Sequence, residues 1–155
     1  MLDARNIRVR LGRTKILKGI DLSAASNCFT VIIGPNGSGK TTLLRALTGE
    51  VRFEGDVRLN GIDIARARPV DLAGMRGVLP QSASLSFPFT VHEVVRLGLT
   101  TGVQNDIDMP ARIEEALETV DLGGFGGRLY QELSGGEQQR VQLARVLAQV
   151  WEPVF

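Results

Sequence analysis

Residues 34–42 combine glycines, one lysine and two threonines at the spacing of a phosphate-binding loop. Gly34 and Gly39 allow successive backbone N–H groups to turn inward around phosphate oxygens, and Lys40 supplies a positive charge for the β- and γ-phosphates. The hydroxyl of Thr41 is an oxygen ligand of the kind that Mg²⁺ prefers. The predicted nucleotide-binding residues are Gly34, Pro35, Asn36, Gly37, Ser38, Gly39, Lys40, Thr41 and Thr42. The loop therefore predicts that the protein binds a nucleoside triphosphate with Mg²⁺.

The segments on either side of this loop have the patterns that such a loop requires. Residues 29–33 form a continuous apolar run, which predicts a strand buried on both faces of a mostly parallel sheet. A helix is expected over residues 43–47, ending before Gly49. A glycine-rich turn beside a solvent-exposed lysine is the other interpretation, but the order strand, loop, helix favours phosphate binding.

Further elements surround this unit in the first half of the chain. Residues 5–22 are expected to form two strands around a turn at Gly12-Arg13, because apolar and polar residues alternate there. Residues 51–60 suggest another antiparallel pair, with turns at Gly55-Asp56 and Asn60-Gly61. Residues 69–75 are expected to be helical, and residues 77–80 to form a short strand that stops at the proline.

From about residue 90 the pattern becomes helical. Thr90 is the expected N-cap of a helix over 91–97, with Glu93 completing a capping box. A second helix is expected over 111–120, followed by the glycine-rich turn 123–127. A third helix is expected to begin near Ser134, with the apolar stripe Val141, Ala144, Leu147 and Trp151.

Residues 133–140 form a second motif that could bind an anion. Ser134 is a good N-cap, and Gly135 with Gly136 would expose the first backbone N–H groups of the following helix. A capped helix with polar residues in its first turn is the simpler interpretation of this motif taken alone.

Together with the phosphate-binding loop, this motif resembles the signature of the ATP-binding cassette (ABC) ATPases, from about residue 3 to the last residue. The resemblance implies an α/β P-loop NTPase core of ABC type, with antiparallel strands, a mostly parallel sheet and a helical subdomain. It also implies ATP with Mg²⁺ in a head-to-tail dimer. Ser134, Gly135 and Gly136 would then contact the ATP of the partner subunit, with Gln138 nearby. Gln81 matches the Q-loop glutamine that contacts Mg²⁺ and the attacking water.

The chain departs from the family pattern in two places. The aromatic residue that usually stacks on adenine is replaced near residue 11 by Arg10-Leu11. No apolar run ends in Asp-Glu, and the one histidine, His92, lies before the signature, where a first-turn helix residue is expected. We therefore expect a C-terminally truncated cassette of residues 1–155 that lacks the Walker B acids and the switch histidine. Such a stretch should hydrolyse ATP poorly on its own.

The resemblance also implies an organisation within this single domain. Residues 1–87 would form the strand-rich nucleotide-binding core and residues 88–140 the helical subdomain with the signature. Residues 141–155 would return towards the core.

The sequence of residues 78–91 resembles the haem and iron–siderophore import branch of the family, most closely its haem importers. This implies a peripheral subunit on the cytoplasmic face of a bacterial inner membrane. Its partners would be a second copy of itself, a dimeric membrane permease and, indirectly, a periplasmic haem-binding protein. A siderophore or cobalamin importer is one alternative. A soluble cassette ATPase acting in DNA repair or translation is another.

Composition limits the remaining classes. The 155 residues carry 18 Lys+Arg and 17 Asp+Glu, a net charge of +1, so charge balance favours no nucleic-acid partner. Five basic residues in the first hairpin could form a nucleic-acid patch, although alternation is more typical of a solvated strand face. They are Arg8, Arg10, Arg13, Lys15 and Lys18. A single cysteine, Cys28, excludes a disulfide within the chain.

Overall fold

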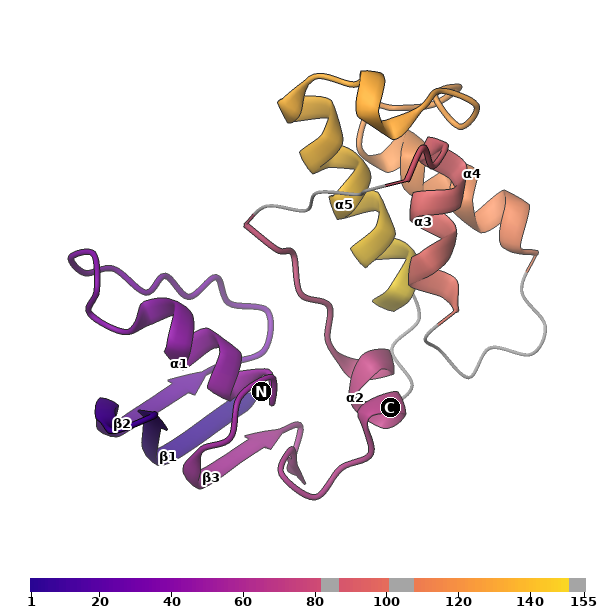
Figure 1. The fold of residues 1–155 in the computed structure, drawn as a ribbon. Helices are drawn as coiled ribbons and strands as arrows, with labels where there is room; N and C mark the ends of the chain where they lie inside the picture. Colours follow the sequence, from indigo (N-terminus) through magenta and orange to yellow (C-terminus); the bar gives the residue numbers. More distant parts are fainter. Residues whose placement is uncertain (82–86, 101–107, 151–155) are drawn as a thin grey trace. The chain divides into compact units, whose positions relative to one another are not determined.

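The computed structural model describes residues 1–81, 87–100 and 108–150 (Figure 1). The chain divides into two compact units, Met1–Ala67 and Arg68–Phe155. The subdomain boundaries expected at residues 87 and 140 remain predictions. No helix within the described residues is long and apolar enough to cross a membrane.

The first unit contains a four-stranded antiparallel sheet. Its strands are β1 (Leu2–Leu11), β2 (Thr14–Ala24), β3 (Glu54–Leu59) and β4 (Ile62–Asp63), in the order β2-β1-β3-β4. The expected turn at Gly12-Arg13 is confirmed, with Gly12 at φ 60°, and Asn60-Gly61 turns the chain between β3 and β4. Both turns use the left-handed backbone that glycine and asparagine tolerate.

The turn expected at Gly55-Asp56 is wrong, because Gly55 lies within β3. Its φ is 111°, and a Cβ there would lie 2.5 Å from the carbonyl oxygen of Arg5 on β1. The β1–β3 pairing shifts register between Arg5 and Arg8. The glycine therefore allows two backbones to approach closely at a bulge rather than reversing the chain.

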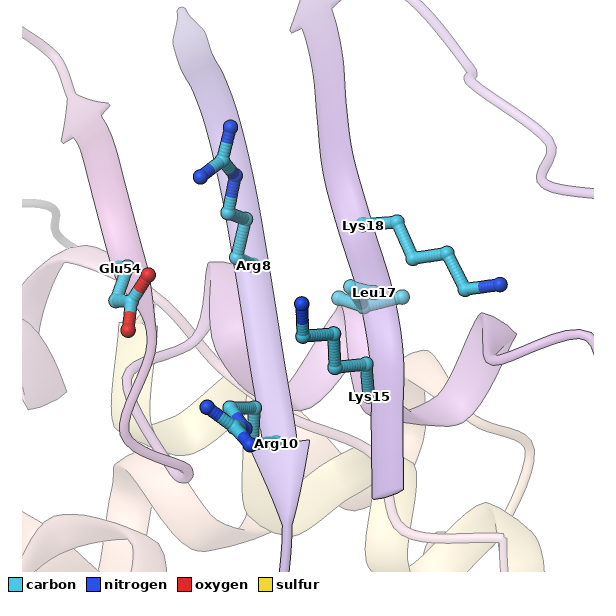
Figure 2. Close-up of a pocket in the computed structure, with 6 residues that line it drawn as sticks. All are labelled: Arg8, Arg10, Lys15, Leu17, Lys18 and Glu54. Atoms are coloured by element: carbon cyan, nitrogen blue, oxygen red, sulfur yellow. The ribbon is translucent and has the colours of Figure 1, made fainter. Parts of the chain in front are cut away.

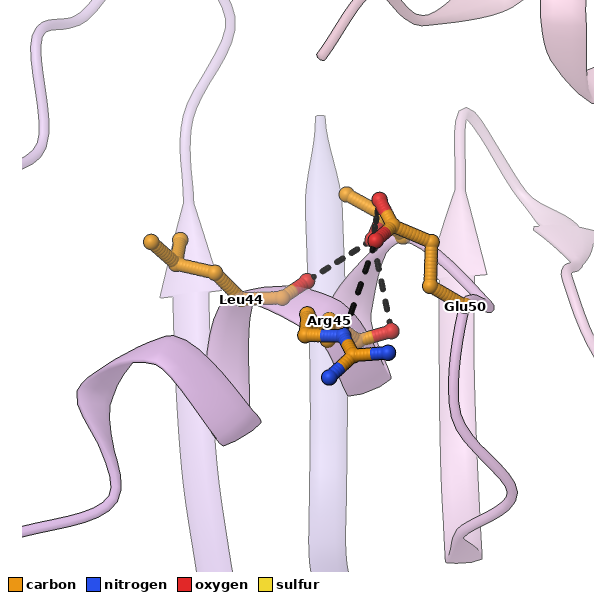
Figure 3. A network of polar contacts seen from close by, with 4 residues as sticks. Leu44, Arg45 and Glu50 are labelled. Carbon is orange, nitrogen blue, oxygen red and sulfur yellow. Dashed lines mark hydrogen bonds and ion pairs between the residues drawn. The ribbon is translucent and has the colours of Figure 1, made fainter. Parts of the chain in front are cut away.

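Helix α1 (Lys40–Leu47) packs against β1 and β2 through an apolar face. The buried residues of this small core are Ala4, Ile7, Val9, Leu17, Leu43, Ala46, Leu47 and Val57. Beyond the helix, the Thr48 hydroxyl lies within hydrogen-bond distance of two acceptors, the carbonyl of Leu44 at 3.0 Å and the carboxylate of Glu50 at 2.9 Å (Figure 3). Arg45 faces the same carboxylate at 3.7 Å. These contacts end the helix that follows the phosphate-binding loop.

The buried parallel strand expected at residues 29–33 is not present. Within the described residues no strand pairs with this segment, and Phe29 and Ile33 are 95% and 87% exposed. Backbone in the extended region forms a strand only when a neighbouring strand accepts and donates its hydrogen bonds. Residues 77–80, expected as a short strand, are also irregular for this reason.

The second unit is a group of helices around one apolar core. It contains α2 (Pro69–Met75), α3 (Val91–Leu99), α4 (Met109–Thr119), a 3₁₀ turn (Tyr130–Glu132) and α5 (Gly135–Val150), and α5 packs against α2, α3 and α4. The four expected helices are therefore confirmed. Val141 and Ala144 of the predicted stripe are fully buried, and Trp151 lies outside the described residues.

The close crossing of α3 and α5 gives the first mutational prediction. A Cβ at Gly98 would overlap the carbonyl oxygen of Arg145 and lie 3.1 Å from its carbonyl carbon. Gly98→Ala should therefore lower the free energy of unfolding by about 3 kcal/mol, since helix backbone cannot yield as a side chain does. Gly74→Ala in α2 is the control, because its Cβ would meet nothing within 4 Å. That change should stabilise by about 0.5 kcal/mol. Urea unfolding of both variants measures the two changes in the free energy of unfolding. Equal changes would contradict the close approach of α3 to α5 at Gly98.

Candidate nucleotide-binding site

The predicted phosphate-binding loop forms an exposed turn directly before α1. Gly37 and Gly39 have φ angles of 79° and 94°, and the N–H of Ser38 donates to the carbonyl of Pro35 at 3.3 Å. Gly39 is the N-cap of α1 and has no side chain to cap it. The first N–H groups of the helix therefore face outward with the positive end of the helix dipole. This is the backbone arrangement that binds phosphate.

Lys40 folds back over this loop. Its Nζ donates to the carbonyl oxygens of Gly34 at 2.8 Å and Pro35 at 2.9 Å. The ammonium group thus lies at the mouth of the loop, and both hydrogen bonds go to neutral acceptors. A phosphate oxygen would be a stronger, charged acceptor for the same donor.

The base of the loop is fixed by the first hairpin. A Cβ at Gly39 would lie 3.1 Å from a methyl group of Leu17 and 3.4 Å from one of Ile16, both on β2. The glycine lets the loop lie directly on the strand. Thr41, the predicted Mg²⁺ ligand, is exposed in the first turn of α1, and Thr42 is half-buried behind it.

The end of the same hairpin holds the residues that replace the expected aromatic. Leu11 is 52% exposed and pairs with Thr14 across the turn, and Arg10 is exposed beside it. The structure therefore offers an aliphatic side chain and a guanidinium at this position, and stacking of adenine on either remains a prediction.

Basic side chains of the hairpin gather around a groove of about 400 Å³ on the sheet (Figure 2). Its lining comprises Arg8, Arg10, Lys15, Leu17, Lys18 and Glu54. Within the described part of the chain, none of the four cations forms an ion pair. Their alternation along β1 and β2 agrees with a solvated strand face, and the expectation of no nucleic-acid partner is untested.

The second predicted anion site lies at the N-terminus of α5, in the other unit. Ser134, Gly135 and Gly136 are exposed, and the Ser134 hydroxyl accepts from the N–H of Glu137 at 3.4 Å. Ser134 is therefore the N-cap, as the sequence predicts. The carboxylate of Glu137 accepts from the Ser134 N–H at 2.8 Å and from its hydroxyl at 2.6 Å. Sequence reasoning missed this capping box, although the spacing Ser-x-x-Glu signals it.

Two glutamines of α5 support the loop around this site. The side chain of Gln138 donates to the carbonyls of Tyr130 at 3.1 Å and Leu133 at 3.2 Å, which fixes the 3₁₀ turn before the signature. Its amide is thus directed into its own unit, and contact with a nucleotide remains a prediction. The side chain of Gln139 donates to the carbonyl of Gln81 at 3.4 Å. The structure thereby brings the predicted Q-loop residue next to the signature helix, with Gln81 itself exposed.

The buried side chain of Gln142 in this unit is structural. Gln142, on α5, donates to the hydroxyl of Tyr130 at 3.2 Å and is 6% exposed. His92 lies in the first turn of α3, as expected, and its N–H donates to the carbonyl of Gly126 at 2.9 Å.

Solved structures of known cassettes share this fold. A nucleotide-free ATP-binding cassette from an ABC transporter is 30% identical, with a TM-score of 0.82, and is matched over 96% of this chain and 64% of that chain. The ADP conformation of MJ1267, an ATP-binding cassette of an ABC transporter, is 30% identical with a TM-score of 0.81. The match covers 96% of this chain and 64% of that chain. The dimeric structure of MJ0796, a bacterial ABC transporter cassette, is 28% identical with a TM-score of 0.79. The match covers 96% of this chain and 70% of that chain. The predicted fold class is confirmed by these neighbours.

Curated relatives are more similar still. The hemin import ATP-binding protein HmuV of Roseobacter denitrificans is 60% identical over 154 residues, and that of Rhizobium meliloti is 57% identical over 156 residues. Each match covers 99% of this chain but only 58% and 59% of the relative, so the chain spans less than two thirds of their length. The family model for the ABC transporter matches residues 17–152. The chain with this phosphate-binding loop and this signature belongs to the ABC transporter family.

Proposed function

We propose that this chain is the ATP-binding, energy-coupling subunit of a bacterial importer of haem. The observation that carries the proposal is the identity of 50–60% to proteins named hemin import ATP-binding proteins. A ferric-siderophore or cobalamin importer is the main alternative, because the same cassette could energise another permease.

ATP and Mg²⁺ fit the residues at the phosphate-binding loop. The left-handed glycines and the outward N–H groups at the start of α1 suit the phosphates, and Lys40 exchanges two carbonyl acceptors for phosphate oxygens. The Thr41 hydroxyl would give Mg²⁺ an oxygen ligand, with water and phosphate oxygens as others, and the resemblance to ABC ATPases assigns Gln81 as a further ligand. The metal would neutralise charge on the phosphates when bound.

The signature loop is the proposed contact with the ATP that a second copy holds. Ser134, Gly135 and Gly136 are exposed at a helix N-terminus, an arrangement that favours an anion. We therefore propose that they meet the γ-phosphate of ATP held by a second copy, so that two ATP molecules close a head-to-tail dimer.

Hydrolysis needs groups beyond those two loops. Water attack requires a positioned nucleophile and a held metal, and these 155 residues contain no apolar run ending in Asp-Glu. We propose that the protein hydrolyses ATP when those acids are present, and that residues 1–155 alone bind ATP without appreciable turnover.

The proposed partners follow from the importer assignment. They are a second copy of the cassette, a dimeric membrane permease and, indirectly, a periplasmic haem-binding protein, with the cassette peripheral on the cytoplasmic face of the inner membrane. A soluble cassette acting on DNA or the ribosome would need neither a permease nor a periplasmic binding protein.

Affinity purification from gently solubilised membranes tests the importer proposal. The tagged protein at its natural full length should retain a polytopic permease after high-salt washing. Recovery from the cytosol with ribosomes or DNA would contradict the proposal.

A further inference from the structure

The carboxylate of Glu137 occupies both proton donors of Ser134. Its Oε2 accepts from the Ser134 hydroxyl at 2.6 Å and from the Ser134 N–H at 2.8 Å. A serine hydroxyl has one proton to donate. In this structure the donor that a phosphate would need is already used within the chain.

The charge of Glu137 is fixed at this position. Hydrogen bonds from the side chain and backbone of Ser134 hold the pKa of the Glu137 carboxyl below its ordinary value, and Arg140 and Arg128 lower it further. The group is therefore ionised at neutral pH. A phosphate arriving at Ser134 would meet a negative charge in hydrogen-bond contact with the atom it must bind, and like charges at such a distance repel strongly.

We propose that Glu137 acts as an internal competitor of the nucleotide, holding the Ser134 proton in the separated subunit and releasing it only when the γ-phosphate of a second copy arrives. Glu137 is a positioning residue in this role, since it acts through Ser134. The inference rests on the proposed contact of Ser134 with the ATP of a second copy. It adds that Glu137 sets the ATP concentration at which two copies close.

The surroundings allow this release. Ser134 is exposed and Glu137 is half-buried, so the carboxylate can leave by rotation of its own side chain while α5 stays in place. Arg140 lies one turn further along α5, where it donates to the carbonyl of Val120 at 3.3 Å, and Arg128 lies over the ring of Phe125 at 3.9 Å. Their positive charges give the released carboxylate a favourable place to go.

The chain contains a matched control for this arrangement. Glu93 forms the same capping box on α3, accepting from the Thr90 hydroxyl at 2.8 Å and the Thr90 N–H at 2.7 Å. Glutamine also completes a capping box, so Glu→Gln removes the charge and keeps the cap geometry in both helices. Glu93→Gln therefore reports the structural effect alone.

The test compares dimer formation by wild type, Glu137→Gln and Glu93→Gln in the protein at its natural full length. Sedimentation velocity follows association as the non-hydrolysable analogue AMP-PNP is added with Mg²⁺. Glu137→Gln should close at about tenfold lower AMP-PNP than wild type, because a charge repulsion has been removed. Glu93→Gln should match wild type, and both variants should melt at similar temperatures. Glu137→Ala, which keeps no acceptor for the Ser134 proton, should also close more readily than wild type.

The outcomes separate this inference from the function beneath it. If wild type dimerises and Glu137→Gln needs the same or a higher AMP-PNP concentration, the competitor role is wrong and the trans site stands. If no protein dimerises although each binds the analogue, the trans site itself is wrong and the inference falls with it. Closure of both Glu137 variants at lower AMP-PNP than wild type and Glu93→Gln would support the competitor role.

Discussion

Replacing Lys40 with alanine is expected to weaken ATP binding about 100-fold, the range for loss of a charged hydrogen bond to an anion. The ammonium group lies at the mouth of the phosphate-binding loop, within 2.8–2.9 Å of two loop carbonyls. Alanine removes the positive charge and also the two hydrogen bonds from Lys40 to the loop carbonyls. Titration with a fluorescent ATP analogue measures the change.

Lys18→Ala is the matched control for this prediction. Lys18 lies on β2 in the same unit, is exposed, and lines the basic groove rather than the loop. It changes the net charge by the same amount, so long-range attraction is lost equally in both variants. An affinity for Lys40→Ala equal to that of Lys18→Ala would contradict the role of Lys40.

Replacing Ser134 with arginine is expected to abolish ATP-dependent dimer closure and hydrolysis while leaving ATP binding by the separated subunit unchanged. The long side chain replaces a small hydroxyl at an exposed helix N-terminus, where the phosphate of the second copy must approach. Loss of the N-cap should lower the free energy of unfolding by about 1 kcal/mol. Nucleotide titration, sedimentation and a phosphate-release assay together measure the three quantities.

Ser134→Thr controls for the capping role. Threonine is also a favourable N-cap and has the same hydroxyl donor, so this variant should keep closure and hydrolysis. Full transport activity in Ser134→Arg would show that no phosphate is bound at this loop. Loss of ATP binding by its separated subunit would mean that the substitution damages the fold.

The local elements could be predicted because their signals are local. The capping box of Thr90 and Glu93 marks the start of α3, and Pro69 marks the start of α2. The hairpin of β1 and β2 follows from alternation around Gly12. In each case the residues that specify the element lie within a few positions of it.

The segment at 29–33 could not be predicted in this way. A run of apolar residues indicates that a strand is possible, but its pairing depends on residues far away in the sequence. In the described structure no strand pairs with it, and its large apolar side chains are exposed. The predicted turn at Gly55 was wrong for a similar reason, because the close approach of Gly55 to Arg5 is a contact between two strands.

The phosphate-binding loop was predicted from the spacing of its residues, and Ser134 was predicted as a helix N-cap. The structure has Ser134 as the N-cap of α5, and phosphate binding at either place remains a prediction. Spacing could not show where the polar side chains that follow Ser134 point. Gln138 turns inward to carbonyls of its own unit, whereas Gln139 reaches the backbone of Gln81. The spacing Ser-x-x-Glu signals the contact of Glu137 with Ser134, but only the atomic positions show that the carboxylate takes the hydroxyl proton of Ser134.

The most direct test of the central claim is ATP hydrolysis by the cassette and its permease in proteoliposomes. Haem-loaded periplasmic binding protein is added in one sample, and the same concentration of siderophore-loaded binding protein in another. We predict that only the haem-loaded protein stimulates hydrolysis, and that Lys40→Ala removes the stimulation. Stimulation by the siderophore-loaded protein alone would contradict haem import and assign the cassette to a siderophore importer.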